Sequence, residues 1–202
     1  MFSLFLAATL SAHAGTVELV PVEAGHPSIS VTVNAGANGP TTDAFIEASL
    51  DVDHYPLTAS YMGVRAITAS QRLATLSDGT VVLHQVTGGN LVVSPRQYVT
   101  ALKETVHTET VAEVQWFLVK HTVNADGSFS GPYAATLNAH RDDAVYTPYS
   151  HGTWRYDRSA GTIKYSTESD PGGALPDFLV SKDAVSACPK ELLMVMWGIL
   201  AK

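Results

Sequence analysis

The sequence predicts an α+β fold in which one late helix covers a long antiparallel sheet. Segments rich in Val, Ile and Thr recur between turn signals across residues 16–169, as expected for strands. Apolar residues then recur at helical spacing from Leu175 to Ile199. Such a sheet must bury one face, and the late helix is the large element available to cover it, so we expect the helix to lie on the sheet.

Composition excludes several classes of protein. The chain has 202 residues, of which 46% are hydrophobic and 15% charged, and this excludes intrinsic disorder. The formal net charge of −7 argues against nucleic-acid binding, which requires a basic contact surface. Cys188 is the single cysteine, so there is neither a disulfide framework nor a thiolate metal cluster.

Residues 1–14 have the features of a signal peptide. An apolar stretch from Leu4 to Leu10 precedes Ala12-His13-Ala14, a small-x-small pattern of the kind that signal peptidase cleaves. The segment has no Lys or Arg, which leaves open a buried N-terminal helix or a start codon assigned too far downstream. We expect cleavage after Ala14, a single domain over residues 15–202, and a periplasmic or secreted protein.

The first part of the mature chain predicts a hairpin and a short helix. Residues 16–22 and 29–35 are rich in Val and Ile and flank Gly25-His26-Pro27. Residues 43–50 form the predicted helix, which Thr41 or Thr42 caps and Asp43 stabilises at its amino end.

A longer run of strands follows, with turn signals at Asp78-Gly79 and Asp126-Gly127. Asp170-Pro171-Gly172-Gly173 ends the run, and Pro189 is expected to divide the late helix. The apolar stretch at 192–201 is shorter than the roughly 20 residues that span a bilayer. The expected strands cover residues 64–75, 80–87, 98–106, 111–122, 133–140, 145–156 and 162–169.

Three segments carry a resemblance to a known family. Residues 89–92 read GNLV and 95–99 read PRQYV, residues 152–156 read GTWRY, and residues 170–180 read DPGGALPDFLV. In this order and spacing the sequence resembles a START domain, the steroidogenic acute regulatory protein-related lipid-transfer domain of the helix-grip or Bet v 1-like superfamily. Gln97, Phe178 and Ser181 depart from the family's usual Asp, Trp and Asn, and its N-terminal helix is missing or replaced by the signal segment.

The resemblance implies a curved sheet wrapped around the C-terminal helix, with an internal cavity for one hydrophobic lipid such as a sterol, phospholipid or fatty acid. Alternating apolar positions in the strands agree with such a lining, although ordinary core packing explains each aromatic residue equally well. The residues expected to line the cavity are Val82, His84, Leu102, Trp116, Leu118, Trp154, Tyr156, Tyr165, Leu175, Phe178 and Leu179.

Two further expectations follow from the resemblance. Sterol-binding members carry an acidic–arginine pair whose matching positions here are Val82 and Leu102, both apolar, so a ligand hydroxyl needs another partner. We also expect a gate hinged at Gly172 and Gly173 and limited by Pro176. The candidate partners for the hydroxyl are His84, Gln85, Thr100, Glu104, Gln115 and His121.

The sequence does not indicate catalysis. The histidines are scattered without metal-ligand spacing, and there is no nucleophile elbow. His107, Glu109 and Glu113 permit an acid–base pair in principle, but solvent-facing alternation explains them more simply. We therefore expect a non-enzymatic, monomeric lipid carrier or sensor with transient membrane contact and no cofactor, metal or nucleic acid. The alternatives are a polyketide cyclase or dehydratase in the same fold, and a ligand-free interaction module.

Overall fold

A computed structural model describes residues 17–22, 26, 28–36, 39–57, 67–88, 94–170 and 172–173. The predicted signal peptide, its cleavage site after Ala14 and the predicted late helix lie outside the described residues. Among the described residues, no helix has the length and apolar character needed to cross a membrane.

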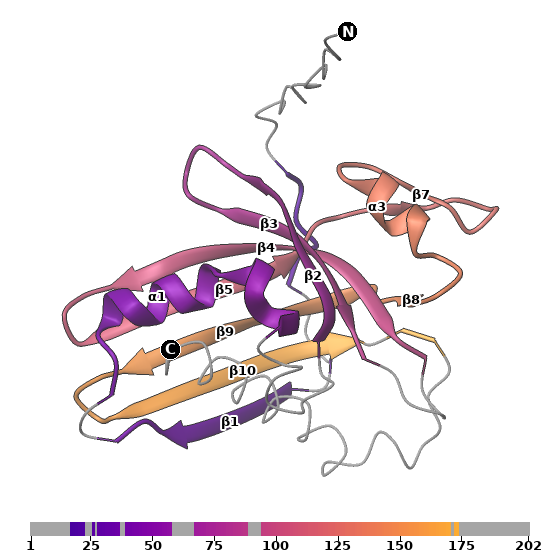
Figure 1. The fold of residues 1–202 in the computed structure, drawn as a ribbon. Helices are drawn as coiled ribbons and strands as arrows, with labels where there is room; N and C mark the ends of the chain where they lie inside the picture. The colour runs from indigo at the N-terminus through magenta and orange to yellow at the C-terminus, as the bar shows by residue number, and fades with distance from the viewer. Residues whose placement is uncertain are drawn as a thin grey trace, which may run out of the picture.

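One curved antiparallel sheet dominates the fold, as the strand pattern predicts (Figure 1). Its strands follow the order β1-β10-β9-β5-β4-β3-β2, and short β8 pairs in parallel with β4. The strands of this sheet are β1 (Ser28–Asn34), β2 (Ile67–Thr75), β3 (Val81–Thr87), β4 (Arg96–His107), β5 (Val111–Leu118), β8 (Val145–Tyr146), β9 (Tyr149–Asp157) and β10 (Thr162–Asp170). Two further strands, β6 (Thr122–Val123) and β7 (Phe129–Ser130), pair with each other as a separate hairpin.

Helix α1 (Thr42–Leu50) lies across the sheet and packs against β4, β5 and β9 (Figure 1). Thr41 caps it, since its hydroxyl accepts a hydrogen bond of 3.1 Å from the Ala44 N–H, as the sequence predicts. Phe45 is fully buried and stacks on Tyr156 of β9 at 5.4 Å between ring centroids. A 3-10 turn, η1 (Val52–His54), follows and packs against β2. We call the side of the sheet that α1 and η1 occupy the inner face.

The opposite side, the outer face, has its own cover. Helix α3 (Ala134–Ala139) and the β6–β7 hairpin bring Leu137 and Phe129 against Val82 and Val99. The sheet is thus covered on both sides at β3, whose first six residues are all buried. This explains why residues 81–83 are apolar on both faces instead of alternating, and why His84 and Gln85 are buried as well.

The structure departs from three of the predicted elements. Residues 133–140 form α3 instead of a strand, because the Ala-rich segment favours a helix where it docks on the outer face. Residues 17–22 do not pair with β1; Leu19 forms an isolated bridge with Val119, while β1 pairs with β10. The predicted strand at 145–156 is interrupted at Pro148, which separates β8 from β9.

The expected strands at 64–75, 80–87, 98–106, 111–122 and 162–169 are confirmed within a few residues as β2, β3, β4, β5 and β10. The helix expected at 43–50 is confirmed as α1. The predicted antiparallel sheet is therefore correct in most of its strands, although not in the pairing of its first.

Gly152 provides a test of the packing on the inner face. It pairs with Trp116 across β5 and β9, and an added Cβ would collide with the Trp116 ring and the Ser166 carbonyl. We expect Gly152→Ala to lower the free energy of unfolding by about 1–3 kcal/mol, measured by urea denaturation. Thr153→Ala, one residue along on the other face, is the control and should change it by less than about 1 kcal/mol. A Gly152→Ala protein as stable as the wild type would contradict this packing.

Candidate functional site

Five of the residues predicted to line a cavity lie together on the inner face. Trp154 of β9 and Tyr165 of β10 have ring centroids 4.5 Å apart, and Trp116 of β5 stacks on Tyr165 at 5.2 Å. Leu102 of β4 pairs with Trp116, and Leu118 lies two residues further along the same face of β5. Strand pairing therefore assembles a continuous apolar surface from residues that are up to 63 positions apart in the sequence.

Tyr156 lies on the same face but is held by α1. Its ring stacks on Phe45, and its hydroxyl donates a 2.8 Å hydrogen bond to the Pro40 carbonyl. Its side chain is fully buried by these neighbours. The structure thus gives Tyr156 a packing role beneath α1.

Val82 and His84 correct the prediction, because they lie on the outer face. Val82 packs with Val99 and Leu137, on the opposite side of the sheet from Leu102 and Trp116. His84 Nε2 lies 3.3 Å from Gln97 Oε1, and its ring stacks on His140 at 5.1 Å. Successive strand residues point to opposite faces of the sheet. An alignment error of one residue therefore assigns a side chain to the wrong face.

Polar side chains lie beside the apolar surface on β2, β3 and β4. The Tyr98 hydroxyl donates a 2.8 Å hydrogen bond to Gln85 Oε1, and these two residues pair across β3 and β4. Ser70 of β2 pairs with Gln85 from the other side, and Thr100 pairs with Leu83 and Leu118. Two of the six candidate hydroxyl partners, Gln85 and Thr100, therefore lie on the inner face, next to each other's strands.

The other polar candidates lie elsewhere. Gln115 alternates with Trp116 and so points to the outer face, where it donates to Glu113 at 3.0 Å. His121 Nε2 bonds the Pro132 carbonyl at 2.6 Å near the β6–β7 hairpin. Glu104 is at the α1 end of β4 and is exposed.

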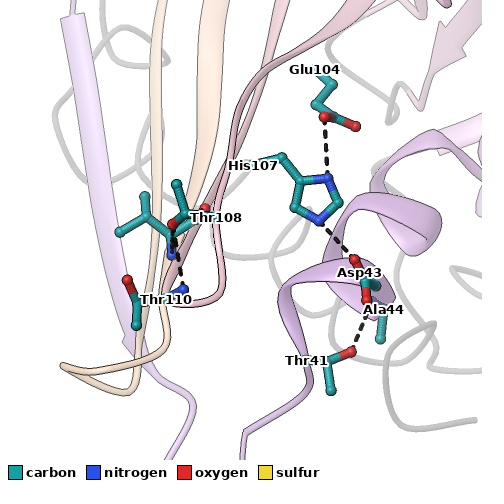
Figure 2. Close-up of polar contacts among 8 residues, drawn as sticks. Thr41, Asp43, Ala44, Glu104, His107, Thr108 and Thr110 are labelled. Atoms are coloured by element: carbon teal, nitrogen blue, oxygen red, sulfur yellow. Dashed lines mark hydrogen bonds and ion pairs between the residues drawn. The ribbon is translucent and has the colours of Figure 1, made fainter.

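His107 joins α1 to the sheet at that same end, as Figure 2 shows. Its Nε2 lies 2.8 Å from Asp43 Oδ1, and its Nδ1 lies 3.2 Å from Glu104 Oε1. Glu113 instead bonds Arg155 at 3.0 Å, so the acid–base pair that the sequence permitted is not assembled. Within the described ranges, no group of three or more His, Cys, Asp and Glu side chains has an arrangement that would hold a metal ion.

The predicted hinge begins at the end of β10. Gly172 and Gly173 both have positive φ, and a Cβ on Gly172 would collide with the Tyr146 carbonyl, so glycine is required there by position. The Arg96 guanidinium donates to the Gly172 carbonyl at 3.2 Å and ties this turn to the start of β4. The gate itself stays a prediction, since Leu175, Pro176, Phe178 and Leu179 lie outside the described residues.

The sequence prediction did not include Ser70, Leu83 and Tyr98, which lie next to Gln85, Thr100 and Leu102 on the inner face. Leu83 lies two residues after Val81, which pairs with Leu102. Once that pairing is known, alternation along β3 assigns Leu83 to the inner face. Ser70 and Tyr98 gave no signal, since a single polar residue in a strand becomes informative only when its cross-strand neighbour is known.

The sequence matches no protein-family model and no curated protein. Solved structures, in contrast, show clear similarity. Human STARD10 aligns with a TM-score of 0.62 at 16% identity over 86% of this chain, which spans 63% of the STARD10 chain. A STAR-related lipid transfer protein from Xanthomonas axonopodis aligns with a TM-score of 0.59 at 17% identity, over 92% of this chain and 99% of that one. The human StarD13 (DLC2) lipid transfer and protein localization domain aligns with a TM-score of 0.56 at 12% identity, over 90% of this chain and 83% of that one.

The fold is that of START domains. The α+β helix-grip class that the sequence predicted is thereby confirmed. In this START fold the candidate site consists of the apolar inner-face residues and the polar group next to them. Its apolar residues are Leu83, Leu102, Trp116, Leu118, Trp154 and Tyr165, and its polar residues are Ser70, Gln85, Tyr98 and Thr100.

His84 predicts how acid affects the outer face of this START fold. Burial lowers the pKa of His84 below its ordinary value of 6.5, and the nearby His140 lowers it further. As the pH falls below about 6.5, His84 is protonated in the unfolded chain but stays neutral in the folded one. The free energy of unfolding therefore decreases. We expect the difference in free energy of unfolding between wild type and His84→Gln to shrink from pH 7.5 to pH 5, measured by urea denaturation. A difference that stays constant over this range would contradict the burial of a neutral His84.

Proposed function

We propose that this protein binds a single hydrophobic lipid on its inner face and carries it between membranes, as a monomer that contacts each membrane transiently. We further propose that it is exported and works in the periplasm or outside the cell. The proposal does not involve a covalent step or a cofactor.

The observation that carries the proposal is the apolar surface on the inner face of a START fold. Two of the similar structures are named as lipid transfer proteins or domains, and the fold supports lipid binding in general. In this chain, Trp116, Trp154 and Tyr165 are buried together on that face, beside Leu102 and Leu118. Affinity would come from apolar area removed from water, at about 25 cal/mol per Å² before ordering costs.

The charges of the described inner face support binding over chemistry. Glu104 and His107 lie at its α1 end, paired with each other and exposed to water. Arg72 is paired with Asp53 through Nε and Oδ2 at 3.3 Å. The centre of the face presents apolar and uncharged polar groups, which suit a ligand that is held without being transformed.

Contact quenching by a brominated lipid tests the proposal. Bromine atoms on an acyl chain quench tryptophan fluorescence at short range, so a chain seated on the inner face should quench Trp116 and Trp154. We expect brominated lipid to quench the wild-type protein, and Trp116→Phe and Trp154→Phe each to lose a substantial part of the quenching. Fluorescence titration with brominated and unbrominated lipid of equal chain length measures this effect.

The unbrominated lipid controls for indirect changes in fluorescence. Phe117→Leu, on the opposite face of β5, is the matched substitution and should leave the quenching unchanged. Equal quenching in wild type, Trp116→Phe and Trp154→Phe would place the lipid away from the inner face and contradict the proposal.

A further inference from the structure

We propose that Ser70, Gln85 and Thr100 form an uncharged polar subsite that selects lipids whose polar group is neutral, bearing a hydroxyl or carbonyl, over lipids with a phosphate. This inference rests on the proposed function, because it names the ligand class of the same inner face. It stands on the contacts of the three side chains and on the state of the nearest arginines.

Gln85 is oriented by a neighbour that leaves part of its amide available. The Tyr98 hydroxyl donates to Oε1 at 2.8 Å, which fixes the amide plane. Gln85 is buried, with 8% of its surface exposed. Among the described residues, its Nε2 nevertheless has no hydrogen-bond partner. An amide held in this way presents a donor to a carbonyl or hydroxyl oxygen.

Ser70 has a buried hydroxyl beside Gln85. Its Oγ is buried and has no hydrogen-bond partner within the described part of the chain. Ser70 pairs with Gln85 across β2 and β3, so both side chains project from the same side of the sheet. Buried hydroxyls are normally satisfied, and an unsatisfied one next to an available amide indicates a group that a ligand completes.

Thr100 links this polar pair to the apolar surface. It is 2% exposed and lies on the inner face between Tyr98 and Leu102 of β4. Thr100 pairs with Leu118 of β5. Two residues along each strand, Leu102 pairs with Trp116 on the same face. A lipid lying along the apolar residues would thus bring its polar end to Thr100, Gln85 and Ser70.

The flanking arginines argue against an anionic polar group. Arg72, two residues from Ser70, donates to the Leu50 carbonyl at 2.7 Å and to Asp53. Arg96, two residues from Tyr98, donates to the carbonyls of Ser94 and Gly172 at 2.5 and 3.2 Å. Both guanidinium groups are already engaged, so a phosphate placed among Ser70, Gln85 and Thr100 would be desolvated without a cation dedicated to it.

Two fluorescent probes with identical acyl chains test the inference: NBD-labelled diacylglycerol, which carries a hydroxyl, and NBD-labelled phosphatidic acid, which carries a phosphate. We expect the wild-type protein to bind the diacylglycerol at least about tenfold more tightly. Gln85→Leu should weaken diacylglycerol binding about tenfold, the scale of one buried hydrogen bond, and leave phosphatidic acid binding unchanged. Gln71→Leu, the same substitution on an exposed outer-face position of β2, is the matched control and should change neither.

Ser70→Ala separates a ligand role from a packing role. Because the Ser70 hydroxyl is unpaired in the structure, its removal should leave the melting temperature unchanged or raise it, while diacylglycerol binding weakens. A lower melting temperature with unchanged binding would assign the hydroxyl to the core and overturn its place in the subsite.

The outcomes also distinguish this inference from the proposed function. If both probes bind equally and Gln85→Leu changes neither, the selective subsite is wrong and lipid binding stands. If neither probe binds, and the fluorescent sterol dehydroergosterol also fails to bind, the proposed function itself is wrong and the inference falls with it.

Discussion

The pleat of β3, β4 and β5 is the constraint on which the rest of the structure depends. Successive residues of these strands point to the inner face and to the outer face in turn, and the antiparallel register decides which of them are neighbours. Leu102 and Trp116 are therefore neighbours on one side, whereas Val82 and Val99 pack on the other. A shift of one residue in the register would exchange these two sets and remove the apolar surface of the inner face.

The outer face also explains the residue type at position 97. The Gln97 amide is fully buried beneath α3. Nε2 of Gln97 donates to the carbonyls of Leu137 and Ala144 at 3.2 and 3.4 Å, while Oε1 faces His84. A carboxylate cannot donate to two carbonyls, so the residue type follows from the way α3 docks on the sheet.

Much of the fold was predictable from local sequence, because alternation, turn residues and the Thr41 cap act within a few residues. Trp116 and Trp154 lie on one face, because the alternation that the sequence shows within each strand agrees with the pairing between the strands. Val82 and Leu102 were both taken from the family spacing, yet Leu102 lies on the inner face and Val82 on the outer face, because a shift of one residue reverses the face. His84 was named only for its polar side chain, without an assignment to either face. The α3 helix was missed because its six residues are too few for a helical period to be distinguished from a strand.

The polar subsite depends on information that no local pattern contains. Ser70, Gln85 and Thr100 come from three strands, and their common face appears only when β2, β3 and β4 are in register. In the sequence Thr100 stands between two apolar residues, whereas Ser70 precedes Gln71 and Gln85 follows His84, so no shared pattern marks the three. Because they lie together beside Leu118, the apolar inner face has a polar group at one end.

Native mass spectrometry of the protein purified without detergent tests the central claim most directly. A lipid carrier should retain one lipid per chain, and organic extraction should release a molecule with an apolar body. A chain of unmodified mass that also takes up no lipid from a total lipid extract would contradict the claim and favour a core that is fully packed without a ligand.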